Sequence, residues 1–309
     1  MKQRYVVTGG AGFIGSKIAQ RLIDGGHQVV VLDNLSTGRE ENIPPAAEFI
    51  KIDLGDESAY ASLGDLRCDA LLHLAGQSSG EASFSDPVYD FHSHVTSTFF
   101  LLDWCRKFGV NRVLYASSMS LYGDQALQPV AENRQLNAPK TYYAASKAAA
   151  ESYLRLYQTL GVNTTLFRMF SVYGPGQDMD NLMQGMLSIY LSFMLRGEPI
   201  LVKGSRERFR DFIYIDDVVD AWVGAIDCER TFGKTYNLAS GQATKVDELI
   251  AMMKRAYGDE NYPVVFADST PGDQFGMYAD MTALKADLGW RPQVSLEDGL
   301  KRMMTTGLI

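Results

Sequence analysis

Tyr143 and Lys147 carry the clearest chemical signal in this sequence, because a spacing of four residues places both on one face of a helix. A phenol titrates near pH 10 and is a poor base at neutral pH. A neighbouring ammonium, reinforced by a positively charged cofactor ring, stabilises the phenolate and lowers that pKa. Ser118 ends the preceding predicted strand and could share a substrate hydroxyl proton with Tyr143. The three side chains predict an acid–base set for alcohol–ketone interconversion beside a hydride acceptor, the alternative being an ordinary helical pair.

A glycine-rich turn near the N-terminus is the predicted site for that acceptor. The run Val6-Val7-Thr8-Gly9-Gly10-Ala11-Gly12-Phe13-Ile14-Gly15 joins a predicted strand, 5–7, to a predicted helix, 16–23. Small residues let backbone N–H groups approach a pyrophosphate, and the helix N-terminus adds its partial positive charge. Glycine spacing alone is a weak signal, but a strand before it and a helix after it indicate a dinucleotide site.

An acidic residue ends the second predicted strand, 28–32. Asp33 comes eighteen residues after Gly15, where a carboxylate accepts both hydroxyls of an adenosine ribose and repels a 2′-phosphate. The sequence therefore predicts NAD rather than NADP. The polar turn 34–38 is expected to lie along the adenosine. Asp53, which follows the third strand, could accept from the adenine amine or cap a helix, and both interpretations stay open.

Strands and helices alternate along the first half of the chain. Further strands are predicted at 48–52, 70–74, 112–116 and 164–170, and helices at 88–107 and 143–160. This alternation predicts an α/β fold with a doubly wound, Rossmann-like parallel sheet that binds ligands at the carboxyl ends of its strands. Beyond residue 172 the alternation is broken and a Met-rich segment follows. We expect an NAD-binding domain over 1–172, to which 211–232 returns, and a smaller interleaved α/β lobe for the substrate over 173–309.

The composition excludes several classes of protein. A formal net charge of −8 argues against general affinity for nucleic acid or anionic membranes, and no apolar run has the length of a membrane span. Three widely spaced cysteines argue against a disulfide scaffold and predict a cytoplasmic protein. His92 and His94 have the spacing of metal ligands, but no cysteine or carboxylate joins them in pattern, so no metal is expected.

Taken together, the motifs resemble those of the extended short-chain dehydrogenases/reductases, and among these the NAD-dependent sugar-nucleotide epimerase/dehydratase family. The resemblance extends over residues 6–300. It rests on the glycine-rich run, Asp33-Asn34, His73-Leu74-Ala75-Gly76, Ser118, Tyr143 and Lys147, Tyr173-Gly174-Pro175, Arg210-Asp211-Phe212 and Leu288-Gly289-Trp290-Arg291-Pro292.

The resemblance implies a reaction as well as a fold. Dehydratases of the family carry an Asp-Glu pair directly after the serine, where this chain has Met119 and Ser120, so loss of water is not expected. The epimerase branch remains, in which C4 of a UDP-hexose is oxidised transiently, the 4-keto sugar turns over, and the hydride returns from tightly bound NAD. The alternatives are a 2-epimerase or net reductase on the same fold, or a non-catalytic NAD-binding regulator. Relatives pair two helices in a dimer seam, which implies a homodimer.

The resemblance also implies a set of binding residues. For the cofactor these are Gly9, Gly12, Phe13, Ile14, Gly15, Asp33, Asn34, Ser36, Thr37, Gly38, Asp53, Leu54, Leu74, Ala75, Gly76, Gln77, His94, Ala116, Tyr143, Lys147 and Phe170. For the substrate they are Ser118, Ser120, Tyr143, Ser171, Asn181, Leu182, Lys203, Arg208, Arg210 and Asp273. Ser171 and His94 stand where relatives carry Asn, and Lys203 stands where an aromatic stacks on uracil. Because a diphosphate needs cations, part of its binding is expected from a basic cluster formed by Lys203, Arg206 and Arg208, whose alternative interpretation is a solvated strand end.

Overall fold

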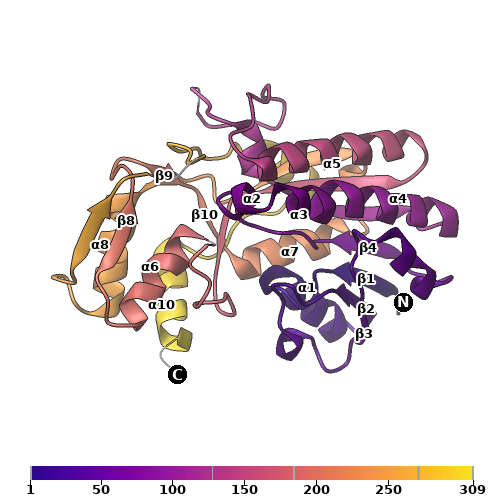
Figure 1. Cartoon of the computed structure of the whole chain (residues 1–309), viewed down its shortest axis with the longest axis horizontal. Coiled ribbons are helices and arrows are strands. Elements are labelled where there is room, and N and C mark those ends of the chain that lie inside the picture. Colours follow the sequence, from indigo (N-terminus) through magenta and orange to yellow (C-terminus); the bar gives the residue numbers. More distant parts are fainter. Residues whose placement is uncertain (1, 127, 184, 270–271, 308–309) are drawn as a thin grey trace.

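The computed structural model describes residues 2–126, 128–183, 185–269 and 272–307, and a seven-stranded parallel sheet runs through its larger part (Figure 1). The strand order is β3-β2-β1-β4-β5-β6-β11. Their bounds are β1 (Arg4–Thr8), β2 (Gln28–Asp33), β3 (Glu48–Lys51), β4 (Ala70–His73), β5 (Arg112–Ser118), β6 (Asn163–Met169) and β11 (Lys234–Leu238). The predicted doubly wound sheet is confirmed. After β3 the chain crosses to the other side of β1, so the point where strand order reverses lies between β1 and β4, and ligands bind at such points.

Alternate residues of β1 pack into two separate cores. Val6 belongs to the cluster that includes Leu101 and Leu154, whereas Val7 belongs to the cluster that includes Ile18 and Trp222. Because successive side chains of a strand point to opposite faces, an unbroken apolar run is what a strand covered on both faces requires.

Helices cover both faces of the sheet (Figure 1). On one face α1 (Phe13–Asp24) packs against α7 (Ile215–Ala225), which in turn contacts α9 (Thr282–Leu288). On the other face α4 (Ser97–Phe108) packs against α5 (Tyr142–Thr159). The short helical segments are η1 (Glu40–Asn42), η2 (Glu57–Leu63), α2 (Ala82–Ser85), η4 (Met119–Tyr122) and η5 (Glu229–Thr231).

The single helix predicted over 88–107 has an irregular turn within it. The structure forms α3 (Pro87–Phe91), then a π-helical turn, η3 (His92–Thr96), and then α4. A π turn inserts one residue into the helical repeat and is frequent at functional sites. Here it changes which residues of this stretch face the sheet, and His94 becomes buried while His92 stays exposed. Helical periodicity alone could not show this.

Beyond β6, the described part of the chain adds three small two-stranded sheets and three helices that lie away from the large sheet (Figure 1). β7 (Ser171–Tyr173) pairs with β10 (Phe212–Tyr214) and β8 (Ile200–Lys203) with β13 (Val264–Ala267), both in parallel, whereas β9 (Phe209–Arg210) and β12 (Thr244–Lys245) are antiparallel. The helices are α6 (Met186–Leu195), α8 (Val246–Tyr257) and α10 (Leu296–Gly307), and α8 contacts α10.

After the small sheet strand β7, the chain returns to the large sheet, where β11 pairs with β6. Because α7 packs on α1 and β11 pairs with β6, we propose that the return to the first domain begins near Asp211 and extends to Leu238. The buried carboxylate of Asp211 accepts backbone N–H groups of Ser240, Gly241 and Ala279 at 2.8–3.1 Å, which fixes the chain where this return begins.

None of the described helices is both long and apolar enough to cross a lipid bilayer.

Candidate active site

A cavity of about 1010 Å³ opens at the carboxyl ends of the sheet strands, where the strand order reverses. Its wall is formed by the glycine-rich turn, the ends of β2, β4, β5 and β6, and the first turns of α5. Residues singled out from the sequence that line it are Gly9, Gly12, Phe13, Ile14, Gly15, Asp33, Asn34, Ser36, Thr37, Gly38, Asp53, Leu54, Leu74, Ala75, Gly76, Gln77, Ala116, Ser118, Tyr143, Lys147, Phe170, Ser171 and Asn181.

Two glycines of the glycine-rich turn, Gly9 and Gly15, leave no room for a side chain. A Cβ on Gly15 would lie 2.2 Å from the carbonyl oxygen of Gly9, and Gly9 itself has a φ of +68° with Ala75 N at 2.7 Å from its ideal Cβ. Gly12 is the N-cap of α1 and has no side chain to bind the first turn. The backbone of this turn is thus open to a bound anion, and the cradle fits a pyrophosphate.

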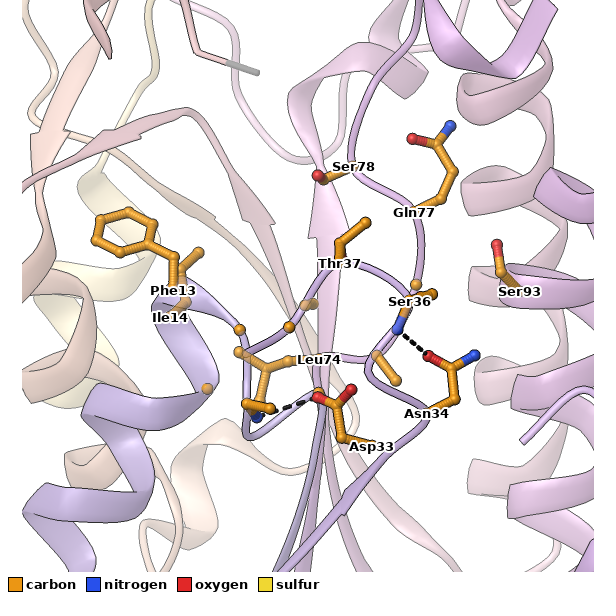
Figure 2. A pocket seen from close by; sticks show the side chains of 18 of the residues that line it. Phe13, Ile14, Asp33, Asn34, Ser36, Thr37, Leu74, Gln77, Ser78 and Ser93 are labelled. Carbon is orange, nitrogen blue, oxygen red and sulfur yellow. Dashed lines mark hydrogen bonds between the residues drawn. The ribbon is translucent and has the colours of Figure 1, made fainter. Parts of the chain in front are cut away.

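Asp33 is held rigidly at the wall of the cavity (Figure 2). Its Oδ2 accepts Ala11 N at 3.0 Å and its Oδ1 accepts Leu35 N at 2.8 Å. The carboxylate therefore joins the glycine-rich turn to the polar turn that follows β2. In that turn, Asn34 Oδ1 accepts Ser36 N at 3.0 Å. The arrangement presents a fixed negative charge beside the cradle.

Asp53 does not cap a helix. Its Oδ1 accepts Gly55 N at 2.9 Å, and the N-cap of η2 is Asp56, whose side chain accepts Ser58 N. The helix-cap interpretation of Asp53 is wrong, because the helical turn starts three residues later than the strand-end carboxylate. Since Asp53 lines the cavity, its role toward adenine stays a proposal.

The three candidate catalytic side chains meet at one end of the cavity. Thr141 caps α5 by accepting Ala144 N at 3.0 Å, and the first two turns of that helix present Tyr143 and Lys147. Lys147 Nζ donates to the carbonyl oxygen of Ala116 at 2.8 Å and lies 5.9 Å from the centre of the Tyr143 ring. Ser118, at the end of β5, hydrogen-bonds with Tyr143.

Burial sets the titration of this pair. It raises the pKa of Tyr143 to about 12, although the hydrogen bond with Ser118 lowers it. Burial also lowers the pKa of Lys147 to about 7, while the charges of Asp90 and Glu151 raise it. The protein by itself therefore disfavours both charged forms, and a phenolate at neutral pH needs a further positive charge close to Tyr143.

His94 does not line the cavity but lies directly behind its wall. A Cβ on Gly76 would be 2.4 Å from Cε1 of His94, and the imidazole packs edge-to-face on the Tyr143 ring at 5.3 Å. Burial and the neighbouring Lys147 lower the pKa of His94 well below its usual value, so the ring is neutral. His94 thus supports Gly76 and Tyr143 from behind.

The remaining substrate candidates do not line the cavity. Arg208 and Arg210 both pair with Asp273, Arg210 at 2.9 Å. Lys203 is exposed and 3.9 Å from Glu81. Ser120 Oγ is 3.0 Å from Ser118 Oγ and so adjoins the catalytic end, whereas Leu182 lies half-exposed outside the wall. The solvated-strand-end interpretation is wrong for Arg208, which is buried and paired with Asp273, but it describes Lys203 and Arg206, which are exposed.

Three features at the site were not found from the sequence. Glu151 lies one turn after Lys147, is fully buried, and accepts from Ser117 Oγ at 2.6 Å and from Arg168 Nη2 at 2.8 Å. Gln274 Nε2 donates to the carbonyl oxygen of Ser120 at 3.2 Å and so joins the Asp273 segment to the catalytic end. The third is Asp90, buried on α3. Only Glu151 had a local signal, its four-residue spacing from Lys147.

The sequence and the fold are similar to known proteins over almost their whole length. Residues 5–239 match the NAD dependent epimerase/dehydratase family. The chain is 36% identical over 306 residues to the UDP-glucose 4-epimerase of Mycolicibacterium smegmatis, covering 97% of this chain and 96% of that one. Among solved structures, UDP-glucose 4-epimerase of Thermotoga maritima with UDP-glucose has a TM-score of 0.93 at 33% identity, with 98% of each chain covered. The complex of Thermus thermophilus UDP-glucose 4-epimerase with NAD has a TM-score of 0.91 at 34% identity, with the same coverage.

Proposed function

The chain belongs to the NAD dependent epimerase/dehydratase family, and on this premise we propose that it is a 4-epimerase of nucleotide sugars of the UDP-hexose class, with NAD retained through each turnover. One observation carries the proposal. The glycine-rich cradle and Asp33 line the same cavity as Ser118, Tyr143 and Lys147. Relatives named for UDP-glucose epimerisation support the choice of substrate.

The chemistry assigned to the chain is proton transfer at the sugar 4-hydroxyl. NAD held by the glycine-rich turn and Asp33 would supply the acceptor and donor of the C4 hydride. Tyr143, as phenolate, takes the proton of the 4-hydroxyl, and Ser118 holds that hydroxyl in line with the phenol oxygen. Lys147 stabilises the phenolate by its charge, with its ammonium fixed by the carbonyl oxygen of Ala116. After the 4-keto sugar has turned over, C4 receives the hydride on its opposite face and Tyr143 returns the proton to the C4 oxygen.

A panel of nucleotide sugars tests this function. The purified protein is incubated with UDP-, GDP-, CDP- and dTDP-hexoses, including N-acetyl and uronic-acid forms, and isomers are followed by NMR. We expect C4 inversion of a UDP-hexose with no net change in NADH absorbance. Stoichiometric consumption of added cofactor would identify a net reductase, and C2 inversion a 2-epimerase. Binding of NAD without turnover of any sugar would favour the regulatory alternative.

Asp33 should make the protein select NAD over NADP by at least about a hundredfold in Kd, or roughly 2.8 kcal/mol. Its fixed carboxylate would face the 2′-phosphate, and like charges a few ångströms apart near a surface repel by several kcal/mol. The nearest cation along the chain, Arg39, is already paired with Asp178 at 2.9 Å. Calorimetric titration with both cofactors at moderate salt measures the ratio.

The variant Asp33→Ala should narrow this ratio and also weaken NAD binding. The second effect follows from the structure, because Ala11 N and Leu35 N lose their acceptor. Asp24→Asn, which neutralises an exposed carboxylate at the end of α1, is the control and should leave the ratio unchanged. Equal affinities of the parent protein for the two cofactors would show that Asp33 does not face the ribose.

We also propose a cytoplasmic homodimer that pairs the α4/α5 faces of two subunits. Large apolar side chains are exposed there, namely Phe99 at 40%, Leu156 at 51% and Leu160 at 54%. Large exposed apolar side chains gathered on two adjacent helices support an interaction site there.

Leu156→Asp should convert the dimer to a monomer, since it places a charge within the proposed seam. Light scattering coupled to gel filtration gives the mass directly. Val265→Asp is the matched control, because Val265 is equally exposed but lies on β13 in the other lobe. A monomeric parent, or a dimer that survives Leu156→Asp, would place the interface elsewhere or remove it.

A further inference from the structure

Asp90 is a fully buried carboxylate that has no bound cation. It lies on α3, and its Oδ1 accepts Gln77 Nε2 at 2.9 Å. No group of the described chain donates to its Oδ2. His94 Nε2 is 3.7 Å from Oδ1, but this imidazole is neutral. Burying a charge without a partner is costly, so a carboxylate at this position requires a positive charge nearby.

Lys147 is a buried cation on α5, the helix that packs against α3. α3 packs against α5, and His94 lies between them, in contact with Asp90 on one side and with the Tyr143 ring on the other. The charge of Asp90 is the largest contribution that raises the pKa of Lys147 against the effect of burial.

The other titratable groups around Lys147 do not supply an unpaired negative charge that could balance its ammonium. From β4 and η3 come the neutral imidazoles of His73 and His94, and from β5 the phenol of Tyr115, whose ring centre is 4.8 Å from Nζ. The second carboxylate, Glu151 on α5, is bound by Arg168 and Arg155. Tyr143 is the last of these titratable groups around Lys147.

We propose that Asp90 is the buried counter-ion of Lys147, a positioning residue that keeps the ammonium charged beside Tyr143. The carboxylate acts across the α3–α5 contact without touching Lys147, and Gln77 holds its orientation from the cavity wall. The inference concerns the protonation of Lys147 and depends on the proposed function only in its consequence for turnover.

That consequence is a shift of the pH profile. Tyr143 and Lys147 titrate as a coupled pair, with two macroscopic pKa values. Removing the negative charge of Asp90 lowers both values, because every protonated state of the pair loses a favourable interaction. Both limbs of the rate profile should therefore move to lower pH in Asp90→Asn.

The direct test follows the Nζ proton of Lys147 in the purified, cofactor-bound protein. Lysine side chains are labelled with ¹³C and ¹⁵N, Lys147 is assigned by Lys147→Arg, and the titration midpoint is read by NMR. Asp90→Asn should lower the midpoint by at least about one pH unit, which is the scale expected for one charge in a buried site. The asparagine oxygen can still accept from Gln77, so the substitution removes the charge and keeps the hydrogen bond.

Asp103→Asn is the matched control, because it removes a carboxylate from the exposed face of the adjoining helix α4 and should leave the midpoint unchanged. Should Asp90→Asn fail to fold, Asp90→Ser is the second neutral variant for the same titration. A shift smaller than one unit, or an equal shift in Asp103→Asn, overturns the proposal. A full shift in a protein that turns over no sugar would contradict the proposed function and leave this inference standing.

Discussion

Replacing Tyr143 by phenylalanine should lower kcat by about 10²–10⁴-fold, the usual contribution of a positioned acid–base group. The phenylalanine ring fills the same space against His94, so the cavity should keep its shape. Only the phenol oxygen that hydrogen-bonds with Ser118 is lost. Steady-state turnover of the best substrate in the sugar panel measures the effect, and calorimetry should show that NAD still binds.

The neighbouring tyrosine provides the control. Tyr142 precedes Tyr143 on α5 but is 50% exposed and does not line the cavity, so Tyr142→Phe should keep kcat within about twofold of the parent. If Tyr143→Phe turned over every active sugar within about tenfold of the parent, the assignment of the proton-transferring group would fail.

Replacing Arg168 by methionine should lower the free energy of unfolding by about 3–5 kcal/mol, because it leaves the buried carboxylate of Glu151 without its main partner. Arg168 donates to Glu151 through Nε at 3.0 Å and Nη2 at 2.8 Å, and both side chains are almost completely buried. Glu151 also holds Ser117, the residue before Ser118. Loss of this partner should therefore disturb the end of β5 that carries the catalytic serine. Urea unfolding followed by circular dichroism measures the stability.

Arg155→Met separates a buried ion pair from an exposed one. Arg155 binds the same carboxylate, but its side chain is 50% exposed, so solvent screens the pair and the loss should stay within about 1 kcal/mol. The double variant Glu151→Leu/Arg168→Met should lose less stability than Arg168→Met, since neither charge is left buried alone. A cost below about 1 kcal/mol for Arg168→Met would show that the buried pair contributes little.

The same pair predicts an acid-sensitive contribution to stability. Burial alone would raise the pKa of Glu151, but hydrogen bonds and charge from Arg168 outweigh it and lower the pKa. A carboxyl whose folded pKa is depressed stabilises the protein above its unfolded pKa and loses that effect as the pH falls through the folded value. The difference between the parent and Arg168→Met should therefore shrink in acid.

Features encoded by short-range spacing were readable in the sequence. The glycines of 9–15, the carboxylate that ends β2, and the spacing of Tyr143 and Lys147 each depend on residues close together in the chain. The strand–helix alternation then places strand ends at one edge of the sheet, because parallel strands require crossovers. For these reasons the fold class and the lining of the cavity could be predicted.

Tertiary structure alone decided which charged groups meet. Asp273 binds Arg210 across 63 residues of sequence, so the cations expected to be free for a diphosphate already have a carboxylate partner. The π turn η3 buries His94 behind Gly76, although a regular helix was expected there. Asp90 and Lys147 come from helices that are brought together only by packing. Periodicity indicates which face of an element is apolar, but it carries no information on which distant charged group will pack against that element. The identity of that charged group determines the protonation of the site.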